Sequence, residues 1–214
     1  MGARTSSNQW ASREHALAYL ERADRVPHRT EGEAVLLGLV PLAARRVLDL
    51  GTGDGRLLAL VKIDRPGMSA VAVDFSPAML EAARARFAAD PAVEVVGHDL
   101  DRPLPDLGRF DAVVSSFAIH HLPHPRKRAI YAEVFDRLAP GGVFCNLEHV
   151  ASPTARLHER FLDELGVGPG EEDPSNLLLD LETQLGWLRE IGYEDVDCCW
   201  KWPELALLTG RRPE

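Results

Sequence analysis

Residues 47 to 55 read Val-Leu-Asp-Leu-Gly-Thr-Gly-Asp-Gly, and they constrain this chain more than any other stretch does. The apolar run at residues 47 to 50 is typical of a buried parallel strand. Gly51, Gly53 and Gly55 follow at alternate positions, and an amphipathic segment begins directly after them. Glycine has no Cβ atom, so the main chain can approach a ligand closely there. The stretch therefore predicts a strand, a ligand-binding turn and a helix.

The spacing of these glycines argues against a dinucleotide. A dinucleotide-binding turn needs the pattern G-x-G-x-x-G, with a diphosphate over the start of the helix. The third glycine would have to stand at Arg56 or Leu58. Asp49 and Asp54 would also turn two carboxylates toward a phosphate. We therefore expect a cationic ligand, and a nicotinamide dehydrogenase is disfavoured.

The pattern D-x-G-x-G-x-G over residues 49 to 55 resembles the first motif of class I S-adenosylmethionine (SAM) dependent methyltransferases. In that family the turn holds the methionine part of SAM, which carries an ammonium and a sulfonium. The resemblance implies that SAM is the cofactor and S-adenosyl-L-homocysteine the product. It also implies that Asp49, Gly51, Thr52 and Gly53 bind the cofactor.

The rest of the chain alternates between strand and helix patterns. The link near Pro203, between the last two expected strands, permits a hairpin but not a parallel crossover. The predicted fold class is α/β, a doubly wound Rossmann-like sheet of seven strands, mostly parallel with one antiparallel strand. Strands are expected at residues 46–50, 69–74, 93–97, 110–115, 142–149, 196–202 and 205–210, and helices at residues 55–63, 77–89 and 126–138.

The helical segments suggest how the chain is divided. Helices at residues 8–25 and 31–39 predict an N-terminal helical lid over residues 1–40, in which Trp10 and Tyr19 are candidates to cover the site. Residues 41–214 would form the SAM-binding domain. A helical insertion at residues 153–192 is expected beside the acceptor pocket.

Doubly wound sheets bind ligands beyond the carboxyl ends of their strands. The second expected strand ends at Asp74, whose carboxylate suits the two hydroxyls of a ribose. Phe75 and Met79 follow in a segment that contacts ribose and adenine in the resembled family. The third strand ends near Asp99, where a carboxylate in that family accepts from the adenine amine; Asp101 is the alternative.

Three further residues complete the predicted cofactor site. Leu100 follows the third strand, and Ser115 ends the fourth, where family members line the methyl-transfer channel. Arg29 suits the carboxylate of SAM or of an acidic substrate. An ordinary surface position is the alternative for Arg29.

The acceptor side is harder to predict, because methyl transfer depends largely on holding donor and acceptor in line. A base is needed only if the acceptor loses a proton. Imidazole titrates near neutrality, which makes His120 and His121, after the fourth strand, candidate bases or positioning groups. Glu148, near the end of the fifth strand, is the third catalytic candidate. The alternative for all three is packing or solvation.

No metal is expected. His120 and His124 have the spacing of helical metal ligands, but Pro123 and Pro125 oppose a helix there. The three cysteines, Cys145 and the adjacent Cys198 and Cys199, give no disulfide framework and predict a reduced, cytoplasmic compartment. Neighbouring strand residues point to opposite faces, which makes the adjacent pair a poor metal site.

The overall composition limits the partners. A net charge of −9 argues against strong nucleic-acid binding. No apolar run reaches the roughly 18 residues of a membrane span. A homodimer is left open.

These observations predict a bacterial enzyme, a class I SAM-dependent methyltransferase that transfers a methyl group to a small-molecule acceptor. Residues 184–193 and 200–202 resemble small stand-alone bacterial methyltransferases and, more distantly, carboxy-SAM synthases. Two alternatives remain: a carboxy-SAM synthase-like enzyme, and a SAM-binding protein without catalytic activity.

Overall fold

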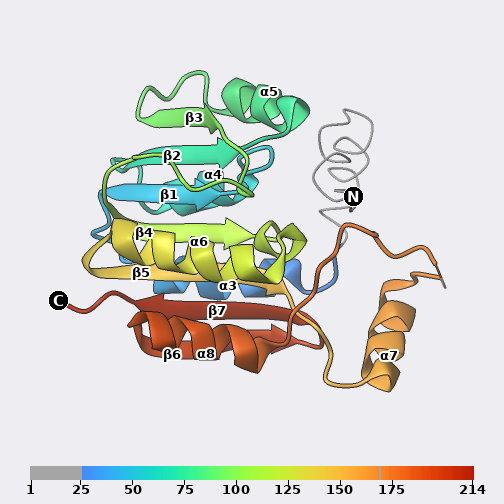
Figure 1. The fold of residues 1–214 in the computed structure, drawn as a ribbon. Coiled ribbons are helices and arrows are strands. Elements are labelled where there is room, and N and C mark those ends of the chain that lie inside the picture. Colours follow the sequence, from blue (N-terminus) through green and yellow to red (C-terminus); the bar gives the residue numbers. More distant parts are fainter. Residues whose placement is uncertain (1–25, 169) are drawn as a thin grey trace.

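The computed structural model describes residues 26–168 and 170–214 of the 214-residue chain. They form one seven-stranded sheet with the strand order β3-β2-β1-β4-β5-β7-β6, with helices on both faces (Figure 1). The strands are β1 Arg46–Leu50, β2 Ser69–Asp74, β3 Val93–Gly97, β4 Phe110–Ser116, β5 Leu138–His149, β6 Glu194–Trp202 and β7 Leu205–Arg211. The helices are α3 Arg29–Leu39, α4 Arg56–Ile63, α5 Pro77–Arg86, the 3₁₀ turn η1 Ile119–His121, α6 His124–Arg137, α7 Ala155–Leu165 and α8 Leu181–Ile191.

The strand directions agree with the predicted fold. Strands β1 to β5 pair in parallel, whereas β7 pairs antiparallel with both β5 and β6. Only Pro203 and Glu204 join β6 to β7, so the chain has to reverse there. The prediction of one antiparallel strand in a seven-stranded sheet is confirmed.

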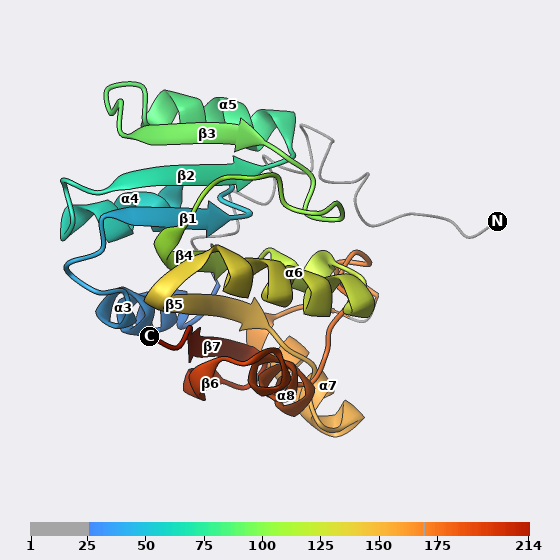
Figure 2. The ribbon, with the colours of Figure 1, turned by 60° about the vertical axis from the view of Figure 1, so that its left-hand side comes forward.

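Each face of the sheet carries its own apolar core. Helices α3 and α4 cover one face, and α6 and α8 cover the other (Figure 2); their side chains belong to two separate clusters. Along β4, Val113 faces the α6 side while Ala112 and Val114 face the opposite side. Because both faces are covered, the central strands are apolar at nearly every position. This explains why their sequences read as continuous apolar runs rather than as alternating patterns.

The start of α6 corrects one expectation. The prolines at positions 123 and 125 were expected to oppose a helix, yet α6 begins at His124 with Pro125 in its first turn. A proline in the first turn loses no hydrogen bond, because the first N–H groups of a helix have no partner within it. The helix therefore begins two residues earlier than predicted.

The insertion also differs in detail from the expectation. The helix α8 begins at Leu181, where Asp180 accepts a hydrogen bond from the Thr183 backbone N–H. Leu177 and Leu178, which fall within the expected helical insertion, instead lie in a non-helical segment before this helix. The helix α7 buries Phe161 alone among its residues. Figure 1 shows α7 beyond the carboxyl ends of the parallel strands.

The described part of the chain leaves some predictions untested. The expected helix at residues 8–25, with Trp10 and Tyr19, lies outside the described residues, and the division of the chain at residue 40 remains a prediction. Among the described residues, no helix combines the length and apolar character needed to cross a bilayer.

Candidate active site

The glycine turn after β1 is built by the main chain. Gly51, Gly53 and Gly55 all adopt positive φ angles, of 66°, 58° and 84°, which side-chain-bearing residues adopt at a cost. A Cβ atom added at Gly51 would lie 2.1 Å from the Cβ of Ala118, in the loop after β4. The Thr52 N–H donates to the Val73 carbonyl over 2.9 Å and fixes the turn to the end of β2. The backbone of the turn is therefore held in a conformation, and at Gly51 in a space, that exclude a side chain.

Two buried carboxylates flank this turn. Asp49 accepts a hydrogen bond from the Thr52 hydroxyl over 2.6 Å. Asp74 accepts from the backbone N–H groups of Gly53 over 2.9 Å and of Ser76 over 2.8 Å. Burial raises the pKa of Asp49 to about 7 and also raises the pKa of Asp74.

The charges at the turn suit a cation. Neither Asp49 nor Asp74 has an ion-pair partner within residues 26–168 and 170–214, whereas Asp54 pairs with Arg86. A buried carboxylate without a cation is costly, so a positively charged ligand would be stabilised here and a diphosphate would be repelled. These residues fit the ammonium and sulfonium of SAM, and contact of Asp74 with the ribose stays a prediction.

The other predicted donor-side residues lie around the same turn. Met79 is buried, and its Sδ atom lies 3.9 Å from the place a Cβ would occupy at Gly53. Leu100 lies 3.9 Å from the corresponding place at Gly51. Phe75 and Asp99 are half-buried at the ends of β2 and β3, and Asp99 accepts from the Asp101 N–H over 3.0 Å.

Ser115 and Arg29 have protein partners in this structure. The buried Ser115 hydroxyl donates to the Leu50 carbonyl over 2.8 Å, which ties β4 to the last residue of β1. Arg29 donates to the buried Glu33 carboxylate over 2.9 Å and stands 5.4 Å from the centre of the Phe117 ring. Arg56 shares the same carboxylate. Direct contact of Ser115 and Arg29 with the cofactor stays a prediction.

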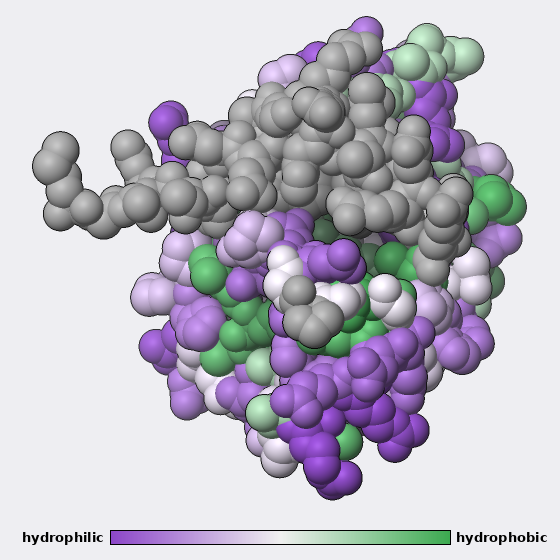
Figure 3. Space-filling view, turned by 90° about the vertical axis from the view of Figure 1, so that its right-hand side faces the viewer, coloured by the Kyte–Doolittle hydropathy of each residue, from purple (hydrophilic) through white to green (hydrophobic). Residues whose placement is uncertain are grey.

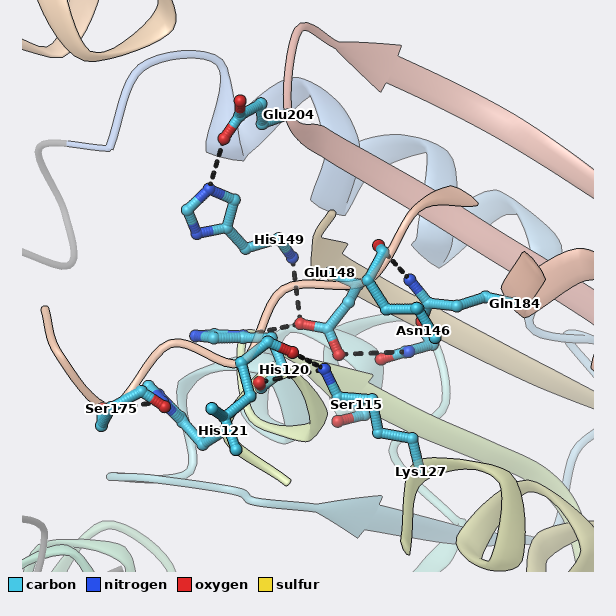
Figure 4. A network of polar contacts seen from close by, with 12 residues as sticks. Ser115, His120, His121, Lys127, Asn146, Glu148, His149, Ser175, Gln184 and Glu204 are labelled. Carbon is cyan, nitrogen blue, oxygen red and sulfur yellow. Dashed lines mark hydrogen bonds and ion pairs between the residues drawn. The ribbon is translucent and has the colours of Figure 1, made fainter. Parts of the chain in front are cut away.

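The acceptor side is built from side chains. His120, on η1, and Glu148, on β5, are both buried, and Nδ1 of His120 lies 2.6 Å from Oε1 of Glu148 (Figure 4). The same carboxylate accepts from the His149 N–H over 2.9 Å. Burial lowers the pKa of His120 well below its ordinary value and raises the pKa of Glu148. The His120–Glu148 pair can therefore present a neutral imidazole, because burial disfavours the protonated ring.

A segment of the insertion contacts the loop that carries His120 and His121. Ser175 Oγ lies 2.9 Å from Nδ1 of His121. Lys127, on α6, is buried and donates to the His120 carbonyl over 3.0 Å and to the Leu177 carbonyl. Burial lowers the pKa of Lys127 to about 8 and that of His121 to about 3. The insertion is thus fixed to the loop that carries both predicted histidines.

Sequence reasoning missed three members of this network. Lys127 faces inward from α6 and is buried, while Arg128 is exposed beside Glu190. Glu204 and His158 also join the site, although both come from distant segments. Helical periodicity from Pro125 could have identified the inward face of Lys127. No local signal marked Glu204.

The glycine turn and the acceptor-side residues all lie at the carboxyl ends of the parallel strands. Figure 3 looks onto the carboxyl ends of the strands and shows apolar residues gathered near the middle of this face, with hydrophilic residues around them. Ala118 touches the glycine turn, and His120 follows two residues later. Within the described residues, no group of three or more metal-ligating side chains is arranged around a common point.

Comparison with known proteins decides the family. Residues 47–142 match the family model described as "Methyltransferase domain". A demethylmenaquinone methyltransferase of Clavibacter sepedonicus is 32% identical over 180 residues, which cover 77% of this chain and 71% of that protein. The chain belongs to the class I SAM-dependent methyltransferases. Its methyl donor is therefore SAM, as the turn predicted.

Other relatives of this methyltransferase differ in what they act on. A carboxy-S-adenosyl-L-methionine synthase of Klebsiella pneumoniae is 26% identical over 200 residues, covering 81% of this chain and 80% of that protein. Human N-acetylserotonin methyltransferase in complex with SAM has the same fold, with a TM-score of 0.72 at 16% identity; the match covers 100% of this chain and 61% of that one. The chain spans about half the length of two further curated relatives.

Proposed function

We propose that this methyltransferase acts on a small-molecule acceptor that carries an ionisable hydroxyl group, with His120 as the general base and Glu148 as its orienting carboxylate. The observation that carries the proposal is the 2.6 Å contact between Nδ1 of His120 and Glu148, two residues beyond the loop position that touches the glycine turn.

The chemistry follows from the two ends of the imidazole. SAM supplies a methyl group activated by its positively charged sulfur. Glu148 engages Nδ1, so the lone pair of a neutral ring is on Nε2, which has no hydrogen-bonding partner among the described residues. This nitrogen can take the proton of an acceptor hydroxyl while the oxygen attacks the methyl carbon. The carboxylate then stabilises the imidazolium that forms.

The surrounding charges favour a neutral acceptor over a carboxylate. The nearby cations already have partners: Lys127 donates to two carbonyls, and Arg29 and Arg56 share Glu33. A carboxylate acceptor, such as the one in the name of the related trans-aconitate 2-methyltransferase, would therefore be bound less well than a phenol-like one.

Isotope labelling tests this function. The protein is incubated with SAM labelled in its methyl group and with a bacterial metabolite extract, and products are identified by mass spectrometry. We expect a labelled small molecule whose formation depends on His120 and Glu148. Binding of SAM without any labelled product would favour the alternative of a SAM-binding protein without catalytic activity.

A carboxy-SAM synthase-like reaction is the second candidate, and the similarity to the Klebsiella enzyme supports it. The resemblance implies prephenate as its second substrate, but no position here matches an arginine that would bind it. Incubation with SAM and prephenate should give no carboxylated SAM.

The predicted setting is also part of the proposal. Cys145, Cys198 and Cys199 are free cysteines, which supports the predicted reduced, cytoplasmic compartment of a bacterial cell. Weak or absent nucleic-acid binding rests on the net charge, and a homodimer remains open.

A further inference from the structure

A second imidazole–carboxylate pair lies beside the first. His149 is the last residue of β5, and its Nε2 lies 3.0 Å from Oε2 of Glu204. Glu204, in the turn between β6 and β7, is completely buried. Its other oxygen lies 2.9 Å from Nδ1 of His158 on α7. One buried carboxylate thus holds two imidazoles that lie far apart in the sequence.

The charge of this carboxylate is balanced on the α7 side. The hydrogen bond that His158 donates to Glu204 raises the pKa of His158, and the charges of Glu204 and Glu172 add to this effect. Burial raises the pKa of Glu204, but hydrogen bonds from His149, Ser152 and His158 outweigh burial and lower it. His149 can donate Nε2–H to Glu204 in the tautomer that carries no proton on Nδ1. Its lone pair is then on Nδ1.

The two pairs are arranged alike and lie close together. The ring centres of His120 and His149 are 5.7 Å apart and the rings meet edge to face. In Figure 4 both rings lie on the same side of the Glu148 carboxylate. Each ring has one nitrogen on a buried carboxylate, and the other nitrogen has no hydrogen-bonding partner in the described part of the chain. The two histidine side chains retain 7% and 15% exposure.

We propose that His149, held by Glu204, is a positioning residue that accepts a hydrogen bond from a second hydroxyl of the acceptor. The inference rests on the proposed function of His120 as the base. The acceptor is then a small dihydroxylated molecule such as a benzenediol: one hydroxyl gives its proton to His120 and receives the methyl group, and the other donates to Nδ1 of His149.

The test compares diols with a single hydroxyl. Benzene-1,2-diol, benzene-1,4-diol and phenol are each offered with SAM, and S-adenosyl-L-homocysteine is quantified by mass spectrometry. We expect kcat/KM for at least one diol to exceed that for phenol by about tenfold, the worth of one well-placed hydrogen bond.

Glu204→Gln tests the proposed role of the carboxylate. The amide would donate to Nε2 of His149 and so move the ring proton to Nδ1, which could then no longer accept a hydroxyl. The preference for the diol should fall to about one. Glu172→Gln is the matched control, because Glu172 contacts His158 and lies on the other side of it from Glu204; it should keep the preference.

A second variant covers the case in which Glu204→Gln does not fold. His149→Asn leaves the contact between Glu204 and His158 in place and should also abolish the preference for the diol. Equal kcat/KM values for phenol and both diols, or an equal loss on all three in either variant, would overturn the role of His149. So would a wild-type protein that methylates extract metabolites but none of the three probes. If nothing is methylated while SAM still binds, the proposed function itself fails.

Discussion

The donor side and the acceptor side of this site are built in different ways. Around the glycine turn, the main chain and two carboxylates form the predicted site for SAM within residues 49 to 76, and a single added Cβ at Gly51 would collide with Ala118. On the acceptor side, polar side chains from η1, α6, β5, α7 and the β6–β7 turn hold one another. A site made of main chain can serve one cofactor in many proteins, whereas a site made of side chains changes with each substitution. The difference accounts for relatives that share SAM but are named for different acceptors.

The largest expected effect is a loss of kcat without a loss of cofactor affinity when the acceptor side is changed. His120→Gln removes the base but leaves the glycine turn intact, so kcat should fall by about 10²- to 10⁴-fold. The affinity for S-adenosyl-L-homocysteine, measured by calorimetry, should stay within about twofold of the wild type, because the variant removes no residue of the donor side. A matching loss of affinity would show that the two sides are not independent.

The next effect concerns the donor side alone. Gly51→Ala places a methyl group against Ala118 in a left-handed backbone conformation, and we expect it to cost about 2–5 kcal/mol of unfolding free energy. It should also abolish the rise in melting temperature on adding SAM. Gly38→Ala is the control, because a Cβ there meets no atom within 4 Å. A Gly51→Ala protein that still binds SAM would contradict the close-approach argument.

Lowering the pH should change the stability contributions of the donor side and the acceptor side in opposite directions. Asp49 has a raised pKa of about 7 in the folded state, so its contribution to stability grows as pH falls from about 7 toward its unfolded value near 4. His121 has a lowered pKa of about 3, so its contribution is present above its unfolded value near 6.5 and is lost as pH falls. Urea unfolding across this range should show a steeper loss in acid for Asp49→Asn and a shallower loss for His121→Gln, by at most about 1.4 kcal/mol per pH unit. The same slope in all three proteins would remove this distinction.

The smallest effect tests how the insertion is attached. Ser175→Ala removes the hydroxyl that lies 2.9 Å from His121, and we expect about 1 kcal/mol of lost stability and a few-fold higher KM for the acceptor. SAM binding should not change.

The sequence predicts the donor side and the strands around it better than it predicts the acceptor side. The bounds of β1, β2 and β3 agree with prediction because each is an apolar run between turn-forming residues, and the glycine turn needs only local spacing. The predicted start of α6 was wrong because proline was treated as a helix breaker in the first turn, where it is tolerated.

The acceptor side could be predicted only in part. His120, His121 and Glu148 were identified from their places after strand ends, but the partners of His149 and His158 were not. Glu204 is 55 residues from His149 and 46 from His158, and nothing in its neighbourhood marks it as buried. Such contacts depend on tertiary folding of the hairpin and α7, which local patterns do not specify.

Calorimetric titration of SAM into the wild type and into Asp74→Asn tests the central claim most directly. That claim is that the turn after β1, with its buried carboxylates, forms the donor site. We predict one binding site per chain in the wild type and at least about tenfold weaker binding in the variant, because the amide cannot accept both the loop N–H groups and the ligand as a carboxylate does. Equal affinity in the two proteins, or no binding to the wild type, would contradict the account.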